Sequence, residues 1–124
     1  MARLLLVMAA LLGGLSVAGG AFGAHALKGQ LTETALNSFE TGVRYQMYHA
    51  IALLLTAVLA KQNPEINLFT TAGWCFVAGV VLFSGSLYGL SLGGIKALGP
   101  VTPLGGVAFI AGWVCLAIAG AKAF

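Results

Sequence analysis

Four long runs without a charged residue constrain this chain more than any other feature. A helix of about 20 apolar residues crosses the hydrocarbon core of a bilayer. The runs are too long and too uniformly apolar to be the strands of a membrane barrel. They extend over Leu4–Ala24, Tyr45–Ala60, Ile66–Ile95 and Ala97–Ala121. We therefore predict an all-α integral membrane protein, a four-transmembrane-helix bundle in which residues 1–124 form one domain, with spans near 3–25, 41–60, 64–93 and 102–122.

The composition supports a bilayer as the main solvent of the chain. Of the 124 residues, 60% are hydrophobic and only 7% are charged, whereas soluble domains carry roughly 25% charged residues. The net charge of +3 is scattered as single lysines and arginines, which excludes a nucleic-acid-binding surface. Cys75 and Cys115 lie inside apolar runs and are interpreted as buried free thiols. We expect a multi-pass protein of the cell (plasma or inner) membrane.

The first run has an alternative interpretation. Arg3, the apolar stretch 4–12 and the small residues up to 24-AHA-26 are also typical of a secretory signal peptide with its cleavage site. Three further apolar runs follow it. We therefore interpret it as the first membrane helix.

The second run is too short to cross the membrane in its purely apolar part. Ala50–Ala60 holds eleven residues, about half the length that a span needs. The helix must therefore begin near Thr41, which draws Arg44 and His49 into the membrane or its interface. Glu40 precedes Arg44 by four residues, the favourable order for an ion pair on one helical turn.

The ends of the expected helices carry capping residues. Thr32 is a candidate cap for a short amphipathic segment before the second span, which either lies on the membrane surface or continues into that span. Gly42 permits both arrangements. Asn63 before Pro64, and Thr102 before Pro103, are expected to start the third and fourth helices.

Glycines and other small residues recur at the spacing of helix contacts. Such ladders let helix backbones approach closely in lipid. The close contact is expected either inside one bundle or at the seam of a homo-oligomer. The predicted helix-packing residues are Gly19, Gly20 and Gly23 in the first span and Gly85, Gly89 and Gly93 in the third.

Polar residues near the start of the second span form the candidate site. Two histidines in a membrane protein are potential haem ligands or proton-relay groups, although structural histidines are the simpler interpretation. The cationic and aromatic members suit an anionic headgroup, a quinone or a partner's carboxylate, or else a plain interfacial anchor. The candidate polar site comprises His25, Glu40, Arg44, Tyr45, Tyr48 and His49. No nucleophile–base pair, phosphate loop or metal motif is present, so we predict no enzyme activity, cofactor or metal.

Four motifs resemble one known family. The stretches 20-GAFGAHALK-28, 39-FETGVRYQMYHA-50, 83-FSGSLY-88 and 99-GPVTPLGG-106 are similar to small multi-pass membrane proteins of a domain family of unknown function (number 423), with YgdD-like, YwdK-like and animal transmembrane relatives. The resemblance implies a four-helix membrane protein and no assigned activity. Its pattern points to Gly23, His25, Gly42, Arg44, Tyr45, Tyr48, His49, Ser84, Ser86, Tyr88, Pro100, Pro103 and Gly105.

The sequence is consistent with two functions. The first is a non-catalytic structural, accessory or assembly protein, acting as a homo-oligomer or within a larger membrane complex. The second is a minimal transporter or proton-conducting oligomer with a polar entrance at His25, Glu40, Arg44 and His49. Both termini should lie on one side of the membrane. Each side carries three cations, so the positive-inside rule does not decide which side faces the cytoplasm. We expect cytoplasmic termini.

Overall fold

The computed structural model describes residues 1–124, and helices are its only regular structure. Long apolar sequences form helices in lipid because a helix satisfies its own backbone hydrogen bonds. Two π-helical segments and one 3-10 turn interrupt the α-helices. The α-helices are α1 (Ala2–Phe22), α2 (Glu33–Gln62), α3 (Asn67–Gly79), α4 (Gly85–Gly93) and α5 (Val101–Ala123), and the other segments are η1 (Gly23–Leu27), η2 (Val80–Ser84) and η3 (Lys96–Leu98).

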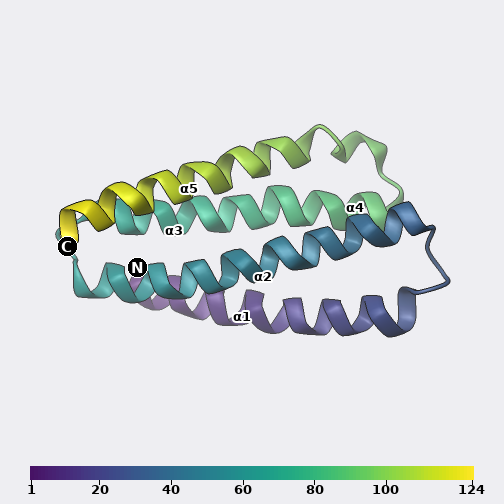
Figure 1. Ribbon diagram of the computed structural model, residues 1–124, viewed down its shortest axis with the longest axis horizontal. Coiled ribbons are helices and arrows are strands. Elements are labelled where there is room, and N and C mark those ends of the chain that lie inside the picture. The colour runs from purple at the N-terminus through teal and green to yellow at the C-terminus, as the bar shows by residue number, and fades with distance from the viewer.

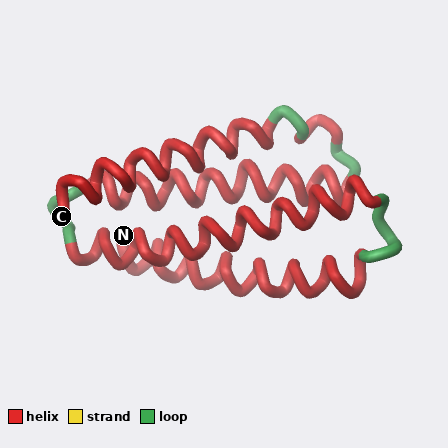
Figure 2. Tube along the Cα trace, viewed as in Figure 1, coloured by secondary structure: helices red, strands yellow, loops and turns green.

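These elements join into four rods, each long and apolar enough to cross a membrane. The rods are Ala2–Leu27, Glu33–Gln62, Asn67–Gly93 and Lys96–Ala123. They run up and down, so that both termini lie at one end of the bundle (Figure 1). Two of the three connections lie at the other end (Figure 2). The expected four-helix membrane bundle is thereby confirmed. We call the two ends the terminal end and the connection end.

The second and third rods form the middle of the bundle. α1 packs along α2, while α5 packs along α3 and η2. Three small apolar clusters fill the interior, and each includes residues of α2. The largest fully buried side chains are Phe69 and Phe76 of α3. Most other large apolar side chains point outward, as expected for a protein whose solvent is lipid.

The amphipathic segment before the second span continues into it as one helix. α2 begins at Glu33, and the Thr32 hydroxyl accepts a hydrogen bond from the Ala35 backbone N–H at 3.1 Å, as a cap residue does. Gly42 does not interrupt the helix. The earlier start places His49 sixteen residues (49 − 33) inside α2, about four turns and near its middle, whereas the sequence suggested two turns.

Two expected helix starts differ from the structure. Asn63 ends α2 instead of starting α3, because its side-chain amide donates to the Leu59 carbonyl at 2.9 Å. α3 then begins at Asn67. α5 begins at Val101, with Pro100 as its cap. Thr102 does not cap α5, because its hydroxyl lies against Ser86 of α4 instead.

A π-helical segment divides the third rod into two parts that face different neighbours. α3 packs mainly on α5, whereas α4 packs mainly on α2. Between them, η2 contains Phe83, whose backbone lies against Gly105 of α5, and Ser84, whose hydroxyl bonds to α2. The wider π turn shifts the helical register. One rod can thereby hold α5 with one half and α2 with the other.

The glycines predicted to pack helices together divide into two groups. Gly19, Gly20 and Gly23 lie against Val43 and Phe39 of α2. The ladder in the third rod meets no other long helix: Gly89 and Gly93 face Leu98 and Ile95 in the following connection, and Gly85 faces open space. Its three glycines therefore turn toward the loop or toward lipid. Glycines that sequence spacing did not single out make the close contacts between rods, namely Gly42, Gly73, Gly79, Gly105 and Gly112.

Candidate functional site

The buried polar side chains of the middle helices form a hydrogen-bonded layer inside the bundle. His49 is 5% exposed, and its ring stacks on Phe109 of α5 with centroids 3.6 Å apart. Its Nε2 accepts a hydrogen bond from the indole Nε1 of Trp113 at 3.1 Å, and its Nδ1 lies 2.8 Å from the Tyr45 carbonyl. An indole N–H only donates and a carbonyl only accepts. These partners therefore assign a neutral imidazole with its hydrogen on Nδ1.

Gln46 connects three of the four rods. Its amide nitrogen donates to the Leu12 carbonyl of α1 at 2.9 Å, and its amide oxygen accepts from the Tyr88 hydroxyl of α4 at 2.6 Å. The Leu12 carbonyl also accepts the Ser16 hydroxyl at 2.8 Å. Both ends of a buried amide are thus used. Gln46 fixes the heights at which α1 and α4 lie beside α2.

Two serines of the third rod complete the layer. Ser84 is fully buried, and its hydroxyl donates to the Gly42 carbonyl of α2 at 2.7 Å. The Ser86 hydroxyl donates to the Phe83 carbonyl at 2.8 Å and accepts from the Thr102 hydroxyl of α5. A hydroxyl that bonds to a neighbouring helix replaces the water that lipid cannot supply. We refer to Gln46, His49, Ser84, Ser86, Tyr88, Thr102 and Trp113 as the polar layer. Thr102 and Trp113 of α5 are its outer members, eleven residues apart (113 − 102), and Trp113 is 47% exposed.

The residues predicted for the candidate site do not gather in one place. Tyr45 stacks against Phe83, with ring centroids 4.7 Å apart, beside the polar layer. Tyr48 is 55% exposed on the outer surface of α2. His25 is also exposed, at the end of the first rod. Since Leu12 lies opposite Gln46, His25 is thirteen residues (25 − 12) further along the rod, about 20 Å along the bundle from the level of Gln46, whereas His49 is buried in the interior. The two histidines therefore do not form one site.

The expected ion pair between Glu40 and Arg44 is replaced by another contact. The Arg44 guanidinium donates to the Thr41 hydroxyl at 3.2 Å, and that hydroxyl in turn donates to the Asn37 carbonyl at 2.9 Å. Arg44 is exposed and Glu40 is half-buried. Thr41 lies one residue after Glu40 and presents a hydroxyl to the arginine from the same turn. Arg44 is thereby held along the surface of α2.

Of the polar layer, only His49 belongs to the candidate site that the sequence predicted. The six members left out are Gln46, Ser84, Ser86, Tyr88, Thr102 and Trp113. Gln46 carried a usable signal, because an uncharged amide within a membrane span must find a partner. Ser84 was among the residues of the family pattern, without a role. Trp113 carried no signal, because an indole near a helix centre is indistinguishable from an apolar residue until its neighbour is known.

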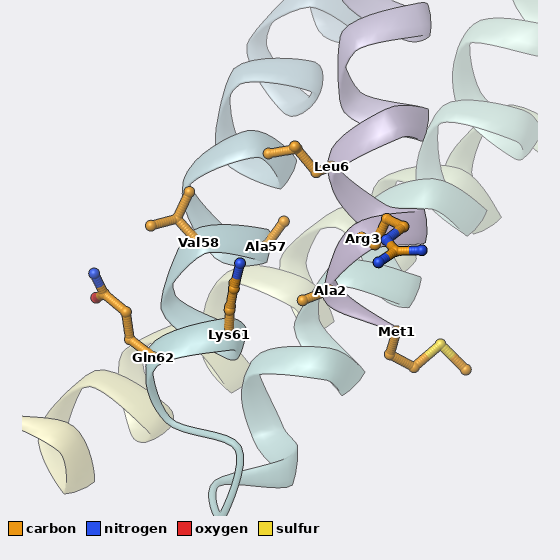
Figure 3. Close-up of a pocket in the computed structure, with 8 residues that line it drawn as sticks. All are labelled: Met1, Ala2, Arg3, Leu6, Ala57, Val58, Lys61 and Gln62. Carbon is orange, nitrogen blue, oxygen red and sulfur yellow. The ribbon is translucent and has the colours of Figure 1, made fainter.

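The hollows of the molecule lie on its outside. The largest is an open cavity of about 780 Å³ between the start of α1 and the end of α2, lined by residues that include Arg3 and Lys61 (Figure 3). A smaller groove of about 390 Å³ at the connection end is rich in hydroxyl and amide groups, from Thr34, Asn37, Ser38, Thr41 and Thr102. Neither is lined by His49. No three side chains among histidine, cysteine, aspartate and glutamate come close enough to hold a metal ion.

Fold and polar layer together define a small multi-pass membrane protein whose interior polar groups bond helix to helix. Residues 19–106 match the family described as "Protein of unknown function (DUF423)", and the chain belongs to it. It is 48% identical over 120 residues to the UPF0382 membrane protein YwdK of Bacillus subtilis (strain 168), covering 97% of this chain and 98% of that relative.

Other relatives extend the same match. The UPF0382 membrane protein SAB0533 of Staphylococcus aureus (strain bovine RF122 / ET3-1) is 46% identical, and SH2409 of Staphylococcus haemolyticus (strain JCSC1435) is 45% identical; both alignments cover 97% of each chain. The expected family is thus confirmed. No solved structure matches this chain.

Proposed function

We propose that this protein is a non-catalytic structural or accessory protein of the cell membrane, acting as an oligomer or within a larger membrane complex. One observation carries the proposal: no buried side-chain nitrogen or oxygen lacks a hydrogen-bond partner. A group that binds a substrate needs a hydrogen-bond donor or acceptor that is free to pair with it. Here every interior polar group has a partner: Gln46, His49, Ser84 and Ser86 bond to neighbouring helices, and Ser16, Thr56 and Ser91 bond to the backbone of their own helix.

The chain also offers little room for a passage. Transporters bind their substrates near the bilayer midplane, in unwound stretches of helix. Near the middle of the bundle, the His49 ring stacks on Phe109, and the rings of Phe76 and Trp113 pack against it at an angle. The protein presents most of its apolar surface outward, to lipid or to a partner helix.

The polar groove at the connection end is the observation that favours the alternative, a minimal transporter or proton conductor. Its hydroxyl groups and the nearby Arg44 resemble an entrance. Phe83 lines the groove and packs against Tyr45 and Phe109, which covers His49. A path from the groove to His49 would require these rings to move aside.

A flux assay on the pure protein separates the two functions. The full chain is placed in liposomes that contain a pH-sensitive dye, and a proton gradient is applied. We expect the same leak as in protein-free liposomes, for the wild type and for His49→Gln. Proton or solute flux that requires the wild-type His49 would contradict the structural role and support the transport role.

The proposed assembly needs its own measurement. Membranes that contain the tagged chain are extracted into native lipid particles, and the mass of the protein content is determined. We expect a mass of at least two copies, or a defined partner, rather than one chain of 12.6 kDa. A single copy in every particle, at native expression, would contradict an assembly role.

A reporter fused to either terminus should be active only on the cytoplasmic side.

A further inference from the structure

We propose that the outer seam between α1 and α2 is a binding site for one anionic phospholipid. Its headgroup would lie in the cavity at the terminal end, and one acyl chain would lie in the groove that follows. The site uses residues outside the polar layer and does not depend on the proposed role. Its parts are a cationic mouth and an apolar groove, which the structure places end to end.

The mouth is the open cavity of about 780 Å³ at the terminal end. Its charged lining comes from Arg3 and Lys61, with Gln62 beside them. Figure 3 shows the Lys61 ammonium directed into the space between the two helices, with Leu6 reaching toward Ala57 and Val58. No acidic side chain lines the cavity. Two cationic side chains, Arg3 and Lys61, above an apolar floor match a phosphodiester attached to hydrocarbon.

Acidic groups elsewhere in the chain do not neutralise this mouth. The sequence has three of them, Glu33, Glu40 and Glu65. Glu33 and Glu40 belong to the first turns of α2, at the opposite end of the bundle from Lys61. Glu65, in the α2–α3 connection, lies at the same end as the mouth but does not line it, and Lys122 at the end of α5 adds a cation to that end. The charge of the mouth therefore favours an anion.

The groove continues from the mouth along the same faces of both helices. It has a volume of about 290 Å³, and its wall includes Ala9, Ala10, Gly13 and Gly14 of α1. Residues 6, 10, 13 and 17 of α1 and residues 61, 58, 54, 51 and 47 of α2 line the mouth and the groove in turn. A spacing of three and four places each set on one helix face.

The length of the groove suits a single acyl chain in one leaflet. The groove is lined on α1 from Ala9 to Val17, eight residues (17 − 9), or about 12 Å along the helix axis. One leaflet contributes about 15 Å of hydrocarbon, half of the core thickness. Gly14 has no atom within 4 Å of the position that a Cβ would take. The floor of the groove is therefore open to an occupant.

The test measures the thermal stability of the purified full chain in detergent with added ligand. Phosphatidylglycerol should raise the melting temperature, whereas phosphatidylcholine, with the same acyl chains, should raise it less. Inorganic phosphate should leave it unchanged, because it lacks the chain that fills the groove. Equal shifts from both lipids, or a full shift from phosphate alone, would overturn the proposal.

Charge variants test the mouth. Arg3→Gln with Lys61→Gln should weaken phosphatidylglycerol binding on the order of thirtyfold, since each cation near an anionic lipid contributes roughly a factor of five in affinity. Lys28→Gln with Lys96→Gln removes the same charge from other positions and is the matched control. Native mass spectrometry counts the bound lipids in both variants. An equal loss of affinity in the two variants would overturn the proposed mouth.

Groove variants test the acyl site and the rival occupant. Gly14→Leu should reduce the difference between the two lipids at least several-fold, whereas Gly85→Leu, which also meets open space, should not. Ala10 and Gly14 would also suit a helix of a second copy of this chain. In that case Gly14→Leu would lower the oligomeric mass and leave the lipid-induced shift intact, which would overturn the lipid assignment.

Discussion

The two outer helices attach to the middle pair in different ways. Along the third rod, α5 lies so close that Gly105 meets the backbone of Phe83, and Gly112 faces the ring of Phe76. Along α2, α1 makes close glycine contacts only near its end, where a Cβ on Gly23 would lie 2.9 Å from Phe39. Its middle is open at Gly14. The close glycine contacts hold α5 firmly against the third rod. The seam between α1 and α2, where Gly14 has no close neighbour, leaves a groove that another molecule can occupy.

The largest effect is expected where the close seam is filled. A Cβ at Gly105 would lie 2.7 Å from the Cα of Phe83, and backbone atoms cannot rotate away. Gly105→Leu should lower the free energy of unfolding by at least about 3 kcal/mol, the upper end of the usual cost of overpacking. Gly106→Leu is the control, because a Cβ at Gly106 would meet no atom within 4 Å. Denaturant titration in detergent, followed by circular dichroism, checks both. Equal stability of the two variants would contradict the close seam.

The next effect concerns His49, the histidine of α2 whose ring packs against α5. His49→Ala removes a buried ring that stacks on Phe109 and leaves the Trp113 N–H without its acceptor. We expect a loss of about 2–3 kcal/mol in the free energy of unfolding, as for other large-to-small changes in a core. Tyr48→Ala, at an exposed neighbouring position, should cost less than about 1 kcal/mol.

A double-mutant cycle isolates the hydrogen bond between His49 and Trp113. Trp113→Phe should cost about 1 kcal/mol in the wild-type background, near the usual value for a hydrogen bond between membrane helices. In the His49→Ala background the same change should cost less. Identical costs in both backgrounds would show that the indole contributes only through packing.

Substitutions in the seam between α1 and α2 should lower the free energy of unfolding less than those in the seam between α5 and the third rod. Gln46→Leu removes the bonds to the Leu12 carbonyl and to the Tyr88 hydroxyl, and should lower the free energy of unfolding by roughly 1 kcal/mol. Ser16→Ala is the control, because the same carbonyl keeps the Gln46 amide as a partner. A loss for Gln46→Leu as large as that for Gly105→Leu would mean that both outer helices are held equally firmly.

The sequence was sufficient for features that depend on local patterns. Apolar runs located the four rods, and the Thr32 cap marked where α2 begins. Asn63 was misplaced because an asparagine amide can also donate to the last carbonyls of a helix. The π segment Val80–Ser84 left no sequence signal. Its extra residue per turn is set by the contacts that Phe83 and Ser84 make with two other helices.

The sequence did not predict which residues far apart along the chain contact each other. Ser84 and Gly42, like Tyr88 and Gln46, are separated by 42 residues. Glycine spacing alone did not say which face of the third rod meets a neighbour. The three-rung ladder faces the loop and open space, whereas Gly79 lies against Phe109. Close contact requires a glycine opposite a large ring, and the opposite residue is known only once the rods are placed.

The smallest effect is expected at Glu40 and Arg44, outside both seams. The order of the two charges suggested an ion pair, but the arginine bonds to Thr41 instead. Glu40→Gln and Arg44→Gln should each change the free energy of unfolding by less than about 0.5 kcal/mol, as is usual for charges at the surface without an ion pair. If the two side chains are independent, the cost of the double variant equals the sum of the single costs. Thr41→Val with Arg44→Gln provides the comparison, and there the costs should not add, because the two residues share a bond. A coupling energy between Glu40 and Arg44 greater than that between Thr41 and Arg44 would restore the ion pair and show that Arg44 exchanges partners in the membrane.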